Sequence, residues 1–122
     1  MTYPKMICIA LIGVAMAALT SCMQVPTGFA ASDKYRLVWN DDPTSTMTII
    51  WDQLEGEHAS VLYGPEDFGR EHWKYPSSQA PTRILADFYG MNTHFAKLEN
   101  LEPDQSYFFV IQDSVGVSER FY

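Results

Sequence analysis

Residues 94–112, HFAKLENLEPDQSYFFVIQ, contain two runs in which apolar side chains recur at every second position. In the first run His94, Ala96 and Leu98 share one parity, and a similar alternation occupies residues 107–112. A spacing of two is typical of a β-strand that buries one face. The stretch therefore predicts two strands separated by a turn, with His94 as a core-facing structural histidine.

The same alternation continues upstream of this stretch. Tyr35, Leu37 and Trp39 form an inward set in the first strand, and residues 45–51 and 59–63 repeat the pattern. Turn-forming Pro, Gly, Asn and Asp residues separate these runs, and β-branched residues within them favour strand over helix. The spacing therefore predicts successive short strands.

Beyond these runs, a last strand is expected to begin near Val117. Trp51 is expected at the centre of the core. Strands at short spacing, with no convincing helix among them, are typical of an all-β sandwich of the immunoglobulin type. We expect about seven strands in one domain over residues 33–122.

Composition limits the partners that this domain can have. The chain of 122 residues carries a net charge of −7 and has no cluster of basic residues, which argues against nucleic acid as a partner. Cys8 lies in the apolar leader described next, so only Cys22 is expected to remain after processing, and no internal disulfide is expected. The fold must then depend on its hydrophobic core.

The N-terminus has the pattern of an export signal. Lys5 precedes an uncharged apolar run over 6–19, which is typical of a signal peptide and its helix. The run ends in the residues LTSC at 19–22, which resemble the lipobox of bacterial lipoproteins, where the cysteine is acylated and becomes the first residue. The pattern predicts a signal peptide over 1–21 and a lipidated tether over 22–32.

The lipidation site would be Cys22, and the protein would be an exported lipoprotein of a bacterial cell envelope, at the outer membrane or the periplasmic face. The membrane would be a partner through the lipid anchor. Gly28-Phe29-Ala30 offers an alternative, because its small residues also fit a plain secretory cleavage site.

A motif in the opening stretch specifies the kind of sandwich. Leu101, Pro103 and Tyr107 fit the pattern Leu-x-Pro-x-x-x-Tyr, which resembles the segment before the sixth strand of fibronectin type III domains. In such a tyrosine corner the ring is buried and the hydroxyl bonds to the backbone of the preceding loop. We expect Tyr107 and Trp51 to have structural roles.

An ordered set of short strings extends the resemblance to a family. The strings are STMTIIW at 45–51, VLYG at 61–64, HFAKL at 94–98 and SERFY at 118–122. Together with the corner, they resemble the N-terminal fibronectin type III-like domain of purple acid phosphatases, which belong to the metallophosphoesterases. The likeness covers nearly all of residues 35–122.

The resemblance implies that the parent enzyme hydrolyses phosphate monoesters with a dinuclear metal site of iron with iron, zinc or manganese. In that family the metal ligands lie in a following catalytic domain, and none of its ligand motifs occurs in this chain. The three histidines, His58, His72 and His94, are too widely spaced for paired metal ligation. We therefore expect no catalytic residue, metal ligand or cofactor in this chain.

The resemblance predicts that this chain is an N-terminal fragment of such an acid phosphatase. We expect an accessory domain without chemistry of its own, followed by a catalytic domain C-terminal to Tyr122. The alternative is a fibronectin type III-like binding or adhesion lipoprotein. The aromatic residues Phe68, Trp73 and Tyr75 are expected to cap the sandwich, and the alternative is that they form a contact surface for either role.

Overall fold

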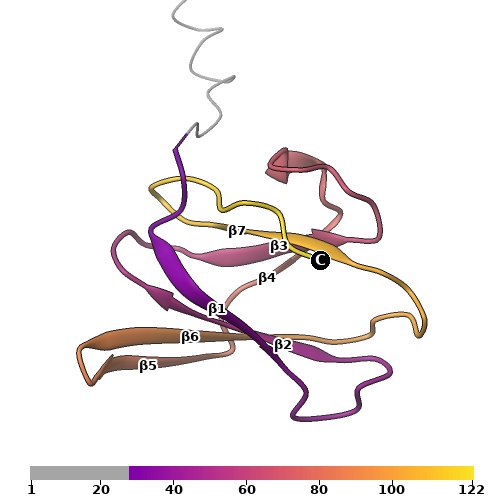
Figure 1. Ribbon diagram of the computed structural model, residues 1–122, viewed down its shortest axis with the longest axis horizontal. Coiled ribbons are helices and arrows are strands. Elements are labelled where there is room, and N and C mark those ends of the chain that lie inside the picture. Colours follow the sequence, from indigo (N-terminus) through magenta and orange to yellow (C-terminus); the bar gives the residue numbers. More distant parts are fainter. Residues whose placement is uncertain (1–27) are drawn as a thin grey trace, which may run out of the picture.

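The computed structural model describes residues 28–122, which form two antiparallel sheets packed face to face (Figure 1). The four-stranded sheet has the order β1-β2-β6-β5, and the three-stranded sheet has the order β4-β3-β7. The expected signal peptide, its helix and Cys22 lie outside the described residues. The prediction of an all-β sandwich with seven strands is confirmed.

The strand bounds follow the predicted alternation where it is strong. The four-stranded sheet consists of β1 (Ser32–Val38), β2 (Met47–Gln53), β6 (Met91–Leu98) and β5 (Arg83–Phe88). The three-stranded sheet consists of β4 (Ser77–Gln79), β3 (Ser60–Gly64) and β7 (Phe108–Gln112), and a short 3-10 helix η1 (His72–Lys74) precedes β4. No helix within residues 28–122 is long and apolar enough to cross a membrane.

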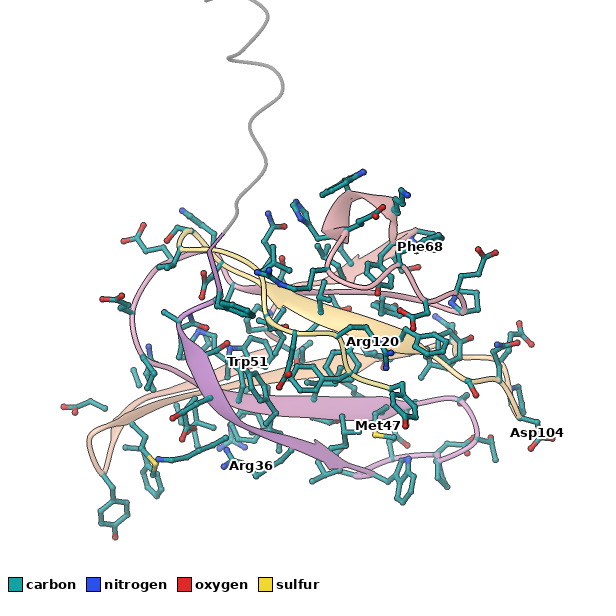
Figure 2. All side chains as sticks on the ribbon, turned by 45° about the horizontal axis from the view of Figure 1, so that its top comes forward. Arg36, Met47, Trp51, Phe68, Asp104 and Arg120 are labelled. Atoms are coloured by element: carbon teal, nitrogen blue, oxygen red, sulfur yellow. The ribbon has the colours of Figure 1, made fainter. Side chains whose placement is uncertain are left out.

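The core lies between the two sheets, where inward side chains of β2 and β6 meet those of β3 and β7. Trp51 is fully buried and pairs in register with His94, so both side chains lie on the inner face. Figure 2 shows Trp51 between the two layers. The buried cluster comprises Ile49, Trp51, Ala59, Val61, Ala96, Leu98, Phe109 and Ile111.

The outer face of the three-stranded sheet is also buried, which the alternation did not predict. Val110 has the outward parity of β7, yet it is fully buried and packs with Tyr75 and Val117. The segment over residues 68–75 lies across this face and brings Phe68 to the same cluster. Because the cover comes from a distant segment, period-two alternation within β7 cannot reveal it.

Two further expectations are corrected by the structure. Leu37 and Trp39 are exposed, although Tyr35 on the same strand packs against the core. The pairing of β1 with β2 shifts register between Asp33 and Arg36, and Lys34 has a φ of +53° there, which marks a β-bulge. After the bulge Leu37 lies opposite the buried Ile49, so it keeps the predicted inner face, but it is exposed because this end of the face borders an open groove.

The expected last strand is reduced to isolated bridges from Val117 to Gln112 and from Phe121 to Phe109. Between the two bridges the Ile111 N–H donates to the Ser118 hydroxyl at 2.8 Å instead of to a backbone carbonyl. A side chain thus takes the place of a ladder acceptor, and the segment lies beside β7 without forming a regular strand.

Candidate interaction surfaces

The tyrosine corner lies in the loop between β6 and β7. The Glu102 N–H donates to the Tyr107 hydroxyl oxygen at 2.8 Å, and the Tyr107 ring lies 6.5 Å from the Tyr63 ring. Leu101 packs against the core, whereas Pro103 is exposed. The structure thus brings Leu101, Pro103 and Tyr107 together where the chain crosses from one sheet to the other.

An apolar groove of about 490 Å³ opens beside this corner. Figure 2 shows Asp104 at the tip of the loop that bounds it. Exposed aromatic rings of Trp39 and Tyr122 contribute to its lining, which also includes Leu37, Met47, Leu98, Leu101, Pro103 and Tyr107. The exposed residues Glu102 and Asp104 stand at its rim. A groove with this apolar lining buries an apolar side chain or segment.

The opposite end of the sandwich is closed by a chain of hydrogen bonds that starts in the core. The Trp51 indole N–H donates to Gln53 Oε1 at 2.8 Å, and Gln53 Nε2 donates to Asp113 Oδ2 at 2.6 Å. Gln53 and Asp113 are both buried, so each must find its partners within the protein. The chain links the central tryptophan to the loop after β7.

Asp113 accepts several hydrogen bonds at this end of the sandwich. Its Oδ2 also accepts from the Ala31 N–H at 2.8 Å, and its Oδ1 accepts from the Val115 and Gly116 N–H groups at 2.8 and 2.9 Å. Sequence analysis did not identify Asp113. Its local signal is the Asp-Ser-x-Gly turn pattern after β7, since aspartate commonly bonds the backbone two residues ahead.

Arg70 holds the start of the described chain against the domain. Its Nη2 donates to the carbonyl oxygens of Gly28 and Val117, both at 2.9 Å, and its guanidinium lies 4.1 Å from the centroid of the Phe29 ring. The Gly28 carbonyl also accepts from the Val117 N–H at 3.0 Å. The tether was predicted over 22–32, but residues 28–31 are already fixed to the domain and β1 begins at Ser32.

The three aromatic residues expected at a contact surface have different environments. Phe68 and Tyr75 pack against each other at 5.4 Å on the outer face of the three-stranded sheet, and the Tyr75 hydroxyl donates to the Gly69 carbonyl at 2.8 Å. Burial raises the pKa of Tyr75 above its ordinary value. Trp73 is 56% exposed. Of the three, Trp73 alone presents most of its ring to solvent.

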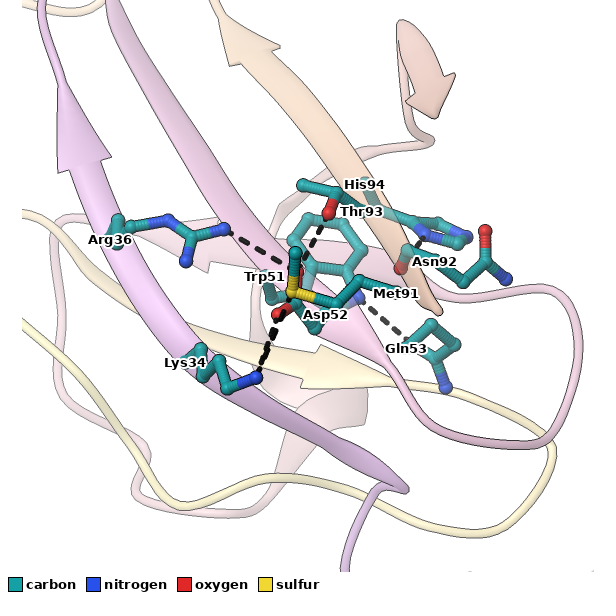
Figure 3. A network of polar contacts seen from close by, with 9 residues as sticks. All are labelled: Lys34, Arg36, Trp51, Asp52, Gln53, Met91, Asn92, Thr93 and His94. Carbon is teal, nitrogen blue, oxygen red and sulfur yellow. Dashed lines mark hydrogen bonds and ion pairs between the residues drawn. The ribbon is translucent and has the colours of Figure 1, made fainter. Parts of the chain in front are cut away.

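A buried carboxylate lies on the outer face of the four-stranded sheet (Figure 3). Asp52 Oδ1 accepts from the Thr93 hydroxyl at 2.8 Å and from Arg36 at 3.4 Å, and Lys34 Nζ lies 3.6 Å from Oδ2. Burial alone would raise the pKa of Asp52, but the hydrogen bond from Thr93 and the two cations outweigh it, so the pKa is lowered. Asp52 is therefore a charged structural group within an ion-pair network.

The histidines do not assemble into a metal site. His94 Nδ1 lies 3.2 Å from the Asn92 carbonyl oxygen, and its ring stacks on Trp51 at 5.4 Å. Burial lowers the pKa of His72, whereas His58 is exposed in the loop between β2 and β3. Across residues 28–122, no group of three His, Cys, Asp or Glu side chains is arranged to hold a metal ion. These residues do not fit the dinuclear metal that the resemblance implies for the parent enzyme.

Comparison with known proteins gives one match. The family model described as "Purple acid Phosphatase, N-terminal domain" matches residues 32–122, from the first residue of β1 to Tyr122. No curated protein and no solved structure matches the chain.

Proposed function

The chain belongs to the purple acid phosphatase N-terminal domain family, and from that premise we propose that it is the non-catalytic accessory domain of an exported phosphatase of this type. The observation that carries the proposal is the family match over the whole described sandwich. The parent enzyme would hydrolyse phosphate monoesters, and its metals would be held by a catalytic domain C-terminal to Tyr122. This chain would contribute support and contact surface.

The groove is the proposed contact surface for that catalytic domain. Tyr122 lines the groove, so a domain that follows it would begin beside Leu37 and Trp39. Burying exposed apolar surface of this kind stabilises an interface by about 25 cal/mol for each Å² removed from water. The exposed aromatic rings at the groove support this role.

Export through a lipid anchor at Cys22 is the second element of the proposal. The contacts of Gly28 and Phe29 with Arg70 and Val117 support processing at Cys22, which leaves both residues in the mature protein. Cleavage after Ala30 would remove them and expose the Arg70 guanidinium that they cover. The anchor would place the enzyme in the cell envelope.

The alternative function is a fibronectin type III-like binding lipoprotein without a catalytic domain. The exposed ring of Trp73 favours it, since solvent-facing tryptophans commonly contact glycans or proteins. A binding lipoprotein would not require the apolar groove to be covered by a following domain.

The coding sequence beyond the codon for Tyr122 separates the two functions. The accessory-domain proposal expects an in-frame continuation that encodes the Asp-x-His and Gly-Asn-His metal-ligand motifs of the family. A stop codon directly after Tyr122 in the intact gene would reject the accessory role and leave the binding lipoprotein.

A further inference from the structure

We propose that the end of the sandwich that carries Gly28 rests on the bilayer surface, with Phe29 and Trp73 at the level of the lipid headgroups. This inference rests on the proposed lipid anchor at Cys22 and adds to it an orientation and a membrane-contacting face. The occupant of this face is the lipid bilayer itself.

The length of chain between the anchor and the domain decides which end faces the membrane. Six Cα-to-Cα steps join Cys22 to Gly28, and fully extended they span at most about 21 Å. A domain of this size is roughly 30 Å across. Because Gly28 is fixed by Arg70 and Val117, the domain cannot turn its opposite end toward the lipid.

The surface beside Gly28 is rich in exposed apolar side chains. Phe29 is 63% exposed, Leu54 is 66% exposed and Trp73 is 56% exposed. Val115 is also exposed at this end. Figure 1 shows the start of the described chain, η1 and the loop after β7 on the same side of the molecule.

Contacts hold the segments of Phe29, Leu54 and Val115 together, and Trp73 follows Arg70 on the neighbouring segment. Arg70 stacks on Phe29, and it lies three positions before Trp73 along the segment that includes η1. The Leu54 N–H donates to the Ala31 carbonyl at 2.7 Å, and Asp113 binds the N–H groups of both Ala31 and Val115. The four apolar side chains therefore belong to one end of the fold.

The charges at this end suit the headgroup region. The Arg70 guanidinium is bonded to backbone carbonyls and Lys74 is paired with Glu71, so neither cation requires an anionic lipid as partner. The exposed carboxylates of Glu55 and Glu57 at the same end oppose contact with anionic lipid. Tryptophan and phenylalanine are favoured at membrane–water interfaces, where the ring is buried and polar atoms stay hydrated. With a net charge of −7, the chain should contact zwitterionic lipid more readily than anionic lipid.

Fluorescence quenching by brominated lipid tests the orientation, because the three tryptophans of the chain report on different places. Trp51 is buried in the core, and Trp39 follows β1 at the groove, away from Gly28. The processed, lipidated protein would be reconstituted into phosphatidylcholine vesicles whose acyl chains carry bromine. Trp73→Phe is the test variant and Trp39→Phe is the matched control, since both side chains are exposed.

We expect the bromolipid to quench the wild-type protein and Trp39→Phe, and Trp73→Phe to lose most of the quenching. Loss of quenching in Trp39→Phe instead, or no quenching in any of the three proteins, would overturn the orientation. Mass spectrometry of the N-terminal peptide keeps the two proposals apart. An acylated Cys22 without Trp73 quenching rejects the orientation alone, whereas an unmodified Cys22 rejects the anchor and the inference with it.

Discussion

The two ends of the sandwich differ in how they are stabilised. At the Gly28 end, Asp113 and Arg70 bind backbone groups of two separate segments, residues 28–31 and the loop after β7, and the Trp51–Gln53 pair ties that end to the core. At the groove end, one tyrosine corner fixes the loop while apolar rings of Trp39 and Tyr122 remain exposed. The difference separates two tasks: the Gly28 end fixes the start of the described chain to the core, and the groove end leaves apolar surface for the proposed partner domain.

Among the changes that test this difference, removing the Asp113 carboxylate should lower the stability of the domain most. Asp113→Ala deletes hydrogen bonds to Gln53 and to three backbone N–H groups, of which the buried Gly116 N–H loses its partner. We expect the free energy of unfolding to fall by about 3 kcal/mol or more. Urea unfolding of residues 28–122 measures it.

Glu102→Ala provides the control at the groove end, because Glu102 is exposed and its backbone N–H, which serves the corner, is retained. This variant should change the unfolding free energy by less than about 0.5 kcal/mol. Equal losses in the two variants would show that the Gly28 end is not the more strongly fixed one.

The strength of the periodic pattern decided how much of the fold the sequence could predict. The inward parity of Ile49, Trp51 and Ala96 was correct because β2 and β6 are central strands with a continuous buried face. β4 has only three residues, and β5 is mostly exposed, so neither has an apolar alternation to detect.

The surfaces depend on contacts between distant residues, and those contacts have no local signature. Asp113 binds Ala31 across 82 positions and Gln53 across 60 positions. Leu37 lies opposite the buried Ile49 on the inner face, yet both Leu37 and Trp39 are exposed because they line the open groove, and their own spacing does not indicate that this part of the face is uncovered. The corner was the exception, because its geometry is encoded within seven consecutive residues.

A second, smaller effect should come from the charge network beside Gln53. Because the pKa of Asp52 is lowered in the folded state, its contribution to stability is present above the unfolded pKa of about 4 and is lost as the pH falls through the folded value. Asp52→Asn should therefore be less stable than wild type at pH 7. The difference in stability between the two proteins should disappear as the pH falls through the folded pKa of Asp52.

Thermal unfolding across that pH range checks the expectation, with Asp104→Asn as a matched control at an exposed carboxylate of the groove loop. A constant difference between wild type and Asp52→Asn at every pH would mean that the charge of Asp52 does not stabilise the fold.

The smallest of the three losses of stability is expected at the tyrosine corner. Tyr107→Phe removes the acceptor of the Glu102 N–H while keeping the ring against Tyr63. Since Glu102 is exposed, its N–H can bond to water, and the loss should be about 1 kcal/mol. Tyr89→Phe is the ring-preserving control, because the Tyr89 side chain is 87% exposed. An unchanged urea midpoint for Tyr107→Phe would show that the corner hydrogen bond does not stabilise the groove end.

The central claim is that this domain belongs to a phosphatase and performs none of its chemistry. The most direct measurement compares phosphate release from p-nitrophenyl phosphate by two samples, each supplied with iron, zinc or manganese. One sample is purified residues 28–122, and the other is the native protein captured from its source cells with an antibody to that domain. The account predicts turnover by the native protein and none above blank by the isolated domain; turnover by the isolated domain, or an inactive native protein, would contradict it.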